Sequence, residues 1–297
     1  MAPDAEIAIE ANPESTTRAT FDGLLATGFT RVSLGVQSLA PHVLTWLGRA
    51  HTPEQALAAL RDATAAGFGH VNADLIFGTP GESLDDWRAS LEGVLATGVD
   101  HVSTYALQVE ERTPLRSWVD RGLRRAPDDD DQADRYELAA GLLPAAGLVR
   151  YEISNWARPG AWSRHNLGYW TGGDYLGFGA GAHAHRSGRR SWNVSSPRTY
   201  VARSPAVEEG WEALRGAERA AEAAMVGLRL AGGLDRGRFA EVWGEDPVVR
   251  WRGELQEAAG LGLIELTDGA VALTERGFFP WGYVARSLLA GGPQSAR

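Results

Sequence analysis

The segment at residues 27–32 reads TGFTRV, and closely similar segments follow as AGFGHV at residues 66–71 and TGVDHV at residues 97–102. Each copy ends a stretch with helical periodicity and precedes an extended apolar stretch. Its glycine is therefore expected to close a helix in the left-handed backbone region before the chain enters a strand. A weaker fourth copy, AGLVRY, occupies residues 146–151. The repeat predicts consecutive βα units.

Short strands alternating with helices are expected through the first half of the chain. The expected strands are Glu6–Ala11, Arg31–Gln37, His70–Phe77 and His101–Leu107. Helices are expected to begin near Ser15, Pro53 and Ser83, and Ser83 has the capping-box spacing to Asp86. This alternation with short connections is typical of a parallel sheet covered by helices. The acidic run from Asp128 to Asp131 is expected at a helix N-terminus or in solvent, without a functional role.

The second half of the chain has a different pattern. Residues 155–205 are rich in aromatic residues, glycine and arginine and lack periodicity, which predicts an irregular segment used for binding or for packing across a sheet edge. Beyond Ala217, three helical stretches precede two apolar stretches joined by Asp268 and Gly269, the order of a winged-helix module. Residues 217–297 hold nine Arg against eleven Asp plus Glu, so we expect this module to pack structurally rather than to bind DNA.

Composition excludes several classes of function. The 297 residues suffice for two domains or one large α/β barrel, and the net charge of −9 disfavours nucleic acid and anionic membranes as partners. All 29 basic residues are Arg, which excludes Schiff-base chemistry and the P-loop lysine. The absence of Cys excludes disulfides, a thiol nucleophile and cysteine-ligated zinc or iron–sulfur sites. Without a signal-like N-terminus or a long apolar run, a cytoplasmic protein is predicted.

Polar side chains follow three of the expected strands. Glu10, Gln37 and Asp74 lie at or near the carboxyl ends, where parallel sheets gather their ligand-binding groups. Together they could hold a ligand with amine and hydroxyl groups, although each alone is also explained as a solvated loop residue or a cap. The turn GTPG at residues 78–81 would let the backbone approach such a ligand closely.

Several motifs resemble one known family. The segments IEANP (9–13), RVSLGVQS (31–38), LGRAH (47–51) and DLIFGTPGE (74–82) are similar to the radical S-adenosylmethionine (SAM) enzymes related to oxygen-independent coproporphyrinogen III oxidase. Within that group, HNLGYW (165–170) and YLGFGAGAH (175–183) resemble the HemW branch of heme chaperones. The resemblance implies an α/β fold, in which an incomplete (β/α)6 partial barrel is followed by a HemW-type α+β winged-helix-like domain. The expected domains are 1–125, 126–205 and 206–297.

The resemblance also implies a SAM site and one large departure from the family. By position, Glu10, Gln37, Arg49 and Asp74 match residues that contact SAM, and their chemistry suits its ammonium, ribose and carboxylate groups. The alternative is that they persist only as barrel scaffolding. Family members hold a [4Fe–4S] cluster on a Cys-x-x-x-Cys-x-x-Cys loop, whereas this chain has no Cys. Without the cluster no electron reaches SAM, so SAM cleavage is not expected.

The first two strands of the family barrel also have no counterpart in the sequence. At ~30 or more residues for each βαβ unit, the deficit is about 70–110 residues. We expect an N-terminally truncated chain, with a genuine relative that lacks the cluster as the alternative.

The HNLGYW segment supplies the groups that heme needs, namely an apolar slot, cations for the propionates and an axial base. The heme candidates are His165, Asn166, Tyr169, Trp170 and His183, with His185 as a weaker one. Further ring faces and cations are expected from Trp162, Phe178, Arg164, Arg186, Arg189 and Arg190. The alternative is that His165 only hydrogen-bonds Asn166 or a backbone carbonyl and that the aromatic residues pack a domain junction.

The resemblance therefore predicts a protein that binds heme and transfers it to an unidentified acceptor protein. No catalytic residue, no metal ligand and no nucleic-acid partner is expected, and membrane association is expected only peripherally, through the acceptor. Two alternatives stay open at this point. One is an enzyme of porphyrin biosynthesis resembling coproporphyrinogen oxidase, and the other is an inactive fragment with unpaired strand edges.

Overall fold

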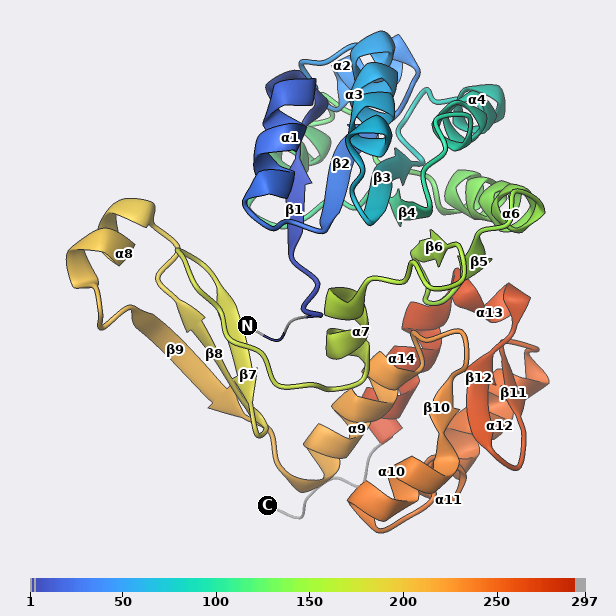
Figure 1. Ribbon diagram of the computed structural model, residues 1–297. Helices are drawn as coiled ribbons and strands as arrows, with labels where there is room; N and C mark the ends of the chain where they lie inside the picture. Colours follow the sequence, from blue (N-terminus) through green and yellow to red (C-terminus); the bar gives the residue numbers. More distant parts are fainter. Residues whose placement is uncertain (1, 3, 292–297) are drawn as a thin grey trace. The chain divides into compact units, whose positions relative to one another are not determined.

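The computed structural model describes residue 2 and residues 4–291. It divides between Trp162 and Ser163 into two compact units, which are described separately (Figure 1). The first unit is built on a six-stranded sheet with the order β1-β2-β3-β4-β6-β5. Its strands are β1 (Ala8–Ala11), β2 (Arg31–Gln37), β3 (His70–Phe77), β4 (His101–Ala106), β5 (Val149–Arg150) and β6 (Asn155–Ala157).

Strands β1 to β4 are parallel, as the repeats predict. The glycines at the ends of the repeats, Gly28, Gly67, Gly98 and Gly147, all have φ between +82° and +98°, which confirms their predicted left-handed conformation. The far edge of the sheet differs, because β6 pairs antiparallel with β4 and β5 pairs antiparallel with β6. The fourth copy of the repeat thus leads into an antiparallel edge strand.

Helices connect these strands, and the longer ones cover one face of the sheet (Figure 1). They are η1 (Pro13–Ser15), α1 (Arg18–Ala26), α2 (Pro41–Trp46), α3 (Pro53–Ala66), α4 (Leu84–Leu95), α5 (Pro114–Asp120) and α6 (Asp129–Ala145). The capping box of Ser83 and Asp86 is confirmed, with both reciprocal hydrogen bonds present. Asp128 caps α6, so the acidic run does lie at a helix N-terminus.

The two faces of this sheet differ in chemistry because side chains alternate along each strand. Val32, Leu34, Leu75 and Phe77 are buried on the helix-covered face. The opposite face carries polar side chains at the intervening positions, among them Ser33, Asn72, Asp74, His101 and Ser103. One face of the sheet therefore packs in the hydrophobic core, and the opposite face presents polar side chains.

The second unit begins with α7 (Arg164–Trp170) and continues into a three-stranded antiparallel sheet, β7-β8-β9. The elements are β7 (His183–Arg186), β8 (Arg189–Asn193), α8 (Pro197–Arg203) and β9 (Glu208–Ala213). The prediction of an irregular segment is wrong here. Ser187 and Gly188, with φ of +50° and +82°, form the two-residue turn of a hairpin. These strands bury neither face fully, so their sequence lacks apolar alternation.

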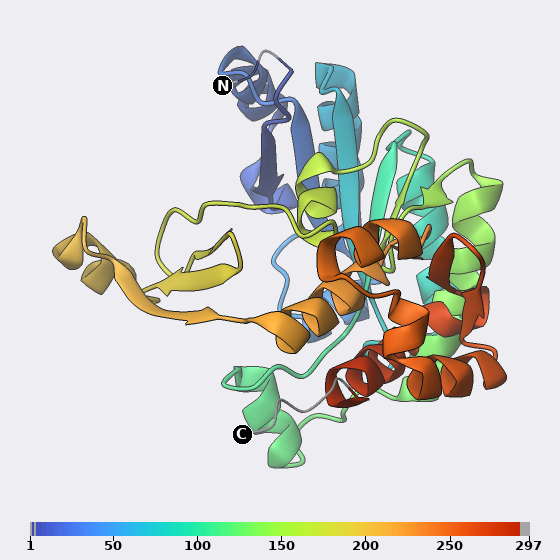
Figure 2. The ribbon, with the colours of Figure 1, turned by 90° about the horizontal axis from the view of Figure 1, so that it is seen from below.

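From β9 the chain passes directly into α9 and the C-terminal module (Figure 2). The module contains α9 (Gly216–Gly227), β10 (Leu234–Asp235), α10 (Arg236–Trp243), α11 (Pro247–Arg250), α12 (Arg252–Gly260), β11 (Ile264–Leu266), β12 (Ala270–Leu273), α13 (Glu275–Phe278) and α14 (Trp281–Gly291). Its sheet has the order β10-β12-β11, and Asp268 and Gly269 lie in the turn between β11 and β12. The predicted order of three helices and a hairpin is confirmed.

Candidate functional site

Asp74 lies on the polar face of β3, where its carboxylate is held by two neighbouring side chains. It accepts hydrogen bonds from Ser33 Oγ at 2.5 Å and from Asn72 Nδ2 at 2.8 Å. Burial raises the pKa of Asp74, and the negative charge of Glu10 on β1 raises it further, against the lowering effect of the hydrogen bonds. Two of the predicted SAM contacts, Glu10 and Asp74, are therefore close enough to interact electrostatically.

The other two predicted SAM contacts meet above Gly35 of β2. Arg49 Nη2 donates to Asn12 Oδ1 at 2.5 Å and to the Gly35 carbonyl at 3.3 Å. A Cβ atom on Gly35 would lie 2.9 Å from Gln37 Nε2 and 3.3 Å from Arg49 Nη2. Arg49 Nε is buried without a hydrogen-bond partner among the described residues. The cluster thus combines a cation that has an unused donor with a glycine that keeps the space above the strand open.

His51 fixes the loop that carries Arg49. Its Nε2 lies 2.9 Å from the Val36 carbonyl and its Nδ1 lies 3.1 Å from the Glu14 carboxylate. The imidazole is buried, whereas the Glu14 carboxylate is partly exposed. These two contacts favour a structural role for His51, the role that its position in a βα element predicts.

The second unit contains a pocket of about 620 Å³, within the range of about 300–1,000 Å³ usual for small-molecule sites. It is lined by the end of α7, by β7 and β8, and by α9 and α10. Its aromatic and imidazole side chains are Tyr169, Trp170, Tyr175, His185, Phe239 and Trp243. Arg190 also lines it and forms ion pairs with Glu212 and Glu222. The wall of this pocket, called the aromatic pocket below, thus combines several ring faces with aliphatic and charged side chains.

The predicted heme residues are distributed unevenly around this pocket. Tyr169 and Trp170 line it. His165 lies one helical turn before Tyr169 and packs edge-on against that ring, with 4.7 Å between centroids, without lining the pocket itself. Asn166 lies in the first turn of α7, where its N–H is capped by Ser163 Oγ. His183 is exposed, with its ring 6.0 Å from that of Trp192.

The secondary ring and cation candidates lie mostly elsewhere. Phe178 is 83% exposed, and Trp162 stacks on Tyr151 at the end of the first unit. Arg189 forms two hydrogen bonds with Glu208 rather than facing this pocket. Arg164 begins α7, and Arg186 is exposed at the end of β7. Of the four predicted cations, the structure places only Arg190 in the wall of the pocket.

His185 is the imidazole that the structure brings into the pocket. Its Nδ1 lies 3.2 Å from the Gly173 carbonyl, and its Nε2 has no hydrogen-bond partner among the described residues. A metal-binding imidazole commonly donates one ring N–H to a backbone carbonyl and presents the other nitrogen to the metal. Sequence reasoning ranked His185 low and missed Tyr175 and Trp243. The Ser-Gly turn, which defines the hairpin that carries His185, was the available signal.

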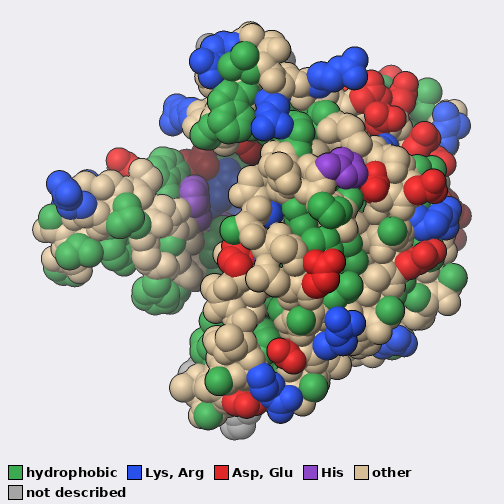
Figure 3. Space-filling view, turned by 90° about the horizontal axis from the view of Figure 1, so that it is seen from above, with side chains coloured by type: hydrophobic (Ala, Val, Ile, Leu, Met, Phe, Trp, Pro, Cys, Tyr) green, Lys and Arg blue, Asp and Glu red, His purple; other side chains and the backbone are tan. Residues whose placement is uncertain are grey.

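The surface and the helices add two further observations. On the face of the molecule shown in Figure 3, acidic and basic side chains are interspersed with one another. Within the described part of the chain, no helix has both the length and the apolar character needed to cross a bilayer.

Comparison with known proteins defines the class of this fold. Residues 1–93 match the model of the radical SAM superfamily, and residues 214–279 match that of the HemN C-terminal domain. The solved structure of coproporphyrinogen III oxidase (HemN) from Escherichia coli, a radical SAM enzyme, superposes with a TM-score of 0.80. It covers 96% of this chain and 70% of its own, at 21% identity. The chain thus has a HemN-like α/β fold, with a radical SAM part followed by a HemN-type C-terminal domain, as predicted.

The closer relationship comes from sequence. The heme chaperone HemW of Mycobacterium tuberculosis is 47% identical over 292 residues, which covers 97% of this chain and 73% of the relative. The heme chaperone HemW of Bacillus subtilis is 33% identical over 278 residues, which covers 92% and 73%. The chain belongs to the HemW family of heme chaperones.

The family implies three bound groups, a [4Fe–4S] cluster, SAM and heme, and the residues of this chain suit them to different degrees. A [4Fe–4S] cluster does not fit, because the sequence has no Cys and the described residues contain no group of three metal-binding side chains. SAM fits the rim of the first unit, where Arg49 Nε lacks a partner and Gly35 leaves room. Heme fits the aromatic pocket, whose buried Trp170 Nε1 also lacks a partner within the described ranges.

Proposed function

We propose that this chain binds heme in the aromatic pocket of its second unit and delivers it to an acceptor protein. The supporting observation is that Tyr169 and Trp170 of the HNLGYW segment line a pocket of about 620 Å³ that also contains the His185 imidazole. A planar apolar macrocycle gains most of its binding energy from such ring faces, and an imidazole supplies an axial base for its iron. Membership in the HemW family supports the same function.

Two imidazoles are candidates for the axial position. His185 lines the pocket with Nε2 unused among the described residues, whereas His165 packs against Tyr169, whose ring lines the pocket. In the proposed complex, Tyr169 and Trp170 contact the macrocycle. The hydrogen bond from His185 Nδ1 to the Gly173 carbonyl favours the tautomer in which Nε2 is unprotonated and can bind iron. In this proposal, residues of α7 and β7 bind heme, and heme itself undergoes no chemical change.

We further propose that SAM binds the rim of the first unit. Arg49 would pair with the methionyl carboxylate through its unused Nε, and Glu10 and Asp74 would face the ammonium and hydroxyl groups. No cleavage step follows, because the chain has no ligands for the cluster that would supply the electron. The cytoplasmic location and the peripheral contact with a membrane through the acceptor stay predictions, which fractionation of cells expressing the protein tests.

The test is a heme titration followed through the Soret band. Wild-type chain, His165→Ala, His185→Ala and the control His42→Ala, whose exposed imidazole lies on α2 outside the pocket, are titrated in parallel. We expect one saturable site, a Soret shift in the variant that lacks the axial ligand, and a wild-type spectrum from His42→Ala. A chain with a cooperative urea transition but no saturable Soret band would overturn the proposal.

A further inference from the structure

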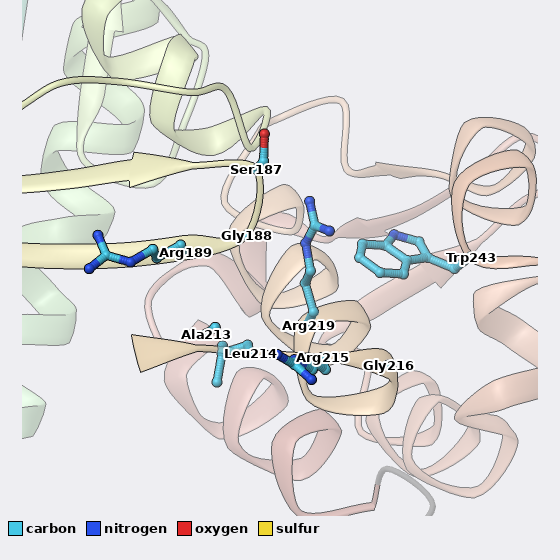
Figure 4. A pocket seen from close by; sticks show the side chains of 9 residues that line it. All are labelled: Ser187, Gly188, Arg189, Ala213, Leu214, Arg215, Gly216, Arg219 and Trp243. Atoms are coloured by element: carbon cyan, nitrogen blue, oxygen red, sulfur yellow. The ribbon is translucent and has the colours of Figure 1, made fainter. Parts of the chain in front are cut away.

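A second cavity adjoins the aromatic pocket in the same unit. Its volume is about 330 Å³, and its wall includes Ser187, Gly188, Arg215, Arg219 and Trp243 (Figure 4). Arg219 and Trp243 line both cavities, so they form the boundary between them. The smaller cavity is bordered by Arg189, Arg215 and Arg219, whereas the wall of the larger one combines Arg190, Arg219 and Arg238 with five aromatic rings.

Arg219 is held in place at this boundary. Its guanidinium carbon lies 5.5 Å from the centre of a Trp243 ring, and the two side chains lie alongside each other in Figure 4. A Cβ atom on Gly188 would lie 2.9 Å from that same carbon, so the hairpin turn packs closely against the guanidinium. Stacking and close packing reduce the rotamer freedom that a flexible arginine would otherwise lose on binding a ligand.

Arg219 also has no acidic partner within the described part of the chain, unlike the two arginines of β8. Arg189 also lines the smaller cavity but is paired with Glu208, and Arg190 is paired with Glu212 and Glu222. The guanidinium groups of Arg215 and Arg219 form no hydrogen bond and no ion pair with any described residue. The two arginines of β8 are thus neutralised by acidic partners, whereas Arg215 and Arg219 have no acidic partner among the described residues.

The Arg219 guanidinium, which has no acidic partner in the described ranges, packs beside the aromatic pocket. Such a cation suits a ligand with a flat apolar body and a carboxylate at its edge. We propose that Arg219, with Arg215 beside it, binds a propionate carboxylate of the heme that occupies the aromatic pocket. The inference rests on the proposed function and adds the group that orients the ligand. A guanidinium pairs with a carboxylate through two parallel hydrogen bonds, which fixes the direction as well as the position of the ligand.

The test separates carboxylate recognition from heme binding. Ferric heme and its dimethyl ester, whose propionates are neutral, are each titrated into wild-type chain, Arg219→Ala, Arg219→Gln, Arg219→Lys and the control Arg252→Ala, whose exposed side chain lies on α12 and lines neither cavity. We expect the wild type to prefer the free acid by about 10- to 100-fold, the range for a charge-assisted hydrogen bond. Arg219→Ala and Arg219→Gln should lose this preference with unchanged affinity for the ester, and Arg219→Lys should recover part of it. Arg252→Ala should behave as wild type.

One further variant, Arg238→Ala, tests whether another cation binds the propionate. Arg238 lines the aromatic pocket, is exposed, and has no side-chain partner among the described residues. If Arg238→Ala abolishes the preference and Arg219→Ala keeps it, the assignment to Arg219 is wrong while heme binding stands. If the folded wild-type chain binds neither porphyrin, both this inference and the proposed function fall. Urea transitions of all variants establish that each one is folded.

Discussion

His101 and Asn72 are joined across neighbouring strands, with His101 Nδ1 2.6 Å from Asn72 Oδ1. An amide oxygen only accepts, so Nδ1 carries the proton and Nε2 accepts from the Tyr151 hydroxyl at 2.8 Å. Asn72 Nδ2 in turn donates to Asp74 at 2.8 Å. A neutral imidazole thus lies at the centre of a buried chain of hydrogen bonds that ends on a proposed SAM contact.

Acid should destabilise the first unit through His101. Burial lowers the pKa of His101 to about 3, from 6.5, with the charges of Arg31 and His70 acting in the same direction. Since the folded pKa is depressed, the unfolded chain binds the proton first, and the stability contribution is complete above pH 6.5. It is lost as pH falls from 6.5 to about 3, by up to about 1.4 kcal/mol per pH unit.

Urea unfolding of wild type and His101→Gln at pH 8, 7, 6 and 5 measures this dependence, and the wild type should lose stability more steeply below pH 6.5. The His101 ring resonances, followed by NMR, should stay those of the neutral form down to pH 5. Protonation of that ring near pH 6.5 would contradict the prediction.

The buried pair of Arg135 and Glu82 should show the opposite pH dependence. Arg135 Nε lies 2.9 Å from Glu82 Oε2, and burial raises the pKa of Glu82 to about 7 even though Arg135 opposes the shift. Because the folded pKa is above the unfolded value, the contribution of Glu82 is complete below pH 4.5 and is lost as pH rises through about 7.

Replacing Arg135 by Met should therefore cost about 3 kcal/mol at pH 8, where Glu82 is left charged without its partner, and clearly less at pH 5. The double variant Glu82→Gln/Arg135→Met removes the charge and should lose most of the pH dependence. Equal losses for Arg135→Met at both pH values would show that the pair is not responsible.

Gly35→Ala should disrupt the proposed SAM site with little effect on the fold. The added Cβ atom would meet Gln37 Nε2 at 2.9 Å and Arg49 Nη2 at 3.3 Å, which displaces both proposed contacts. We expect calorimetric titration to show SAM binding weakened by about tenfold or more, the effect of one lost charge-assisted hydrogen bond. Gly23→Ala in α1 is the matched control, since its Cβ would have no neighbour within 4 Å. Wild-type SAM affinity in Gly35→Ala would remove this cluster from the site.

Tyr169→Ala should weaken heme binding because its ring lines the aromatic pocket. We expect a loss of about tenfold in affinity, comparable to one aromatic contact and its buried area. Phe178→Ala provides the control, because that ring is 83% exposed and does not line the pocket. If heme titrations give both variants the same affinity, the ligand does not occupy this pocket.

Local sequence was sufficient for the regular part of the first unit. Helix caps, glycines that close helices and apolar alternation act over a few residues, so β2, β3, β4 and the starts of α3 and α4 were predicted correctly. The short helices α2 and α5 were missed. Helices of this length have weak periodicity, and their formation depends on the elements that they contact.

The sequence by itself determined the parallel βα units, the helix-and-hairpin order of the C-terminal module, and which residue types follow each strand. These depend on backbone preferences and on short spacings along the chain. The β7-β8-β9 sheet, the entry of His185 into the pocket, and the neutralisation of Arg189 by Glu208 while Arg219 keeps its charge were decided by tertiary structure. Cavity walls and ion pairs join residues far apart in sequence, so no local pattern indicates which arginine is paired and which is available to a ligand.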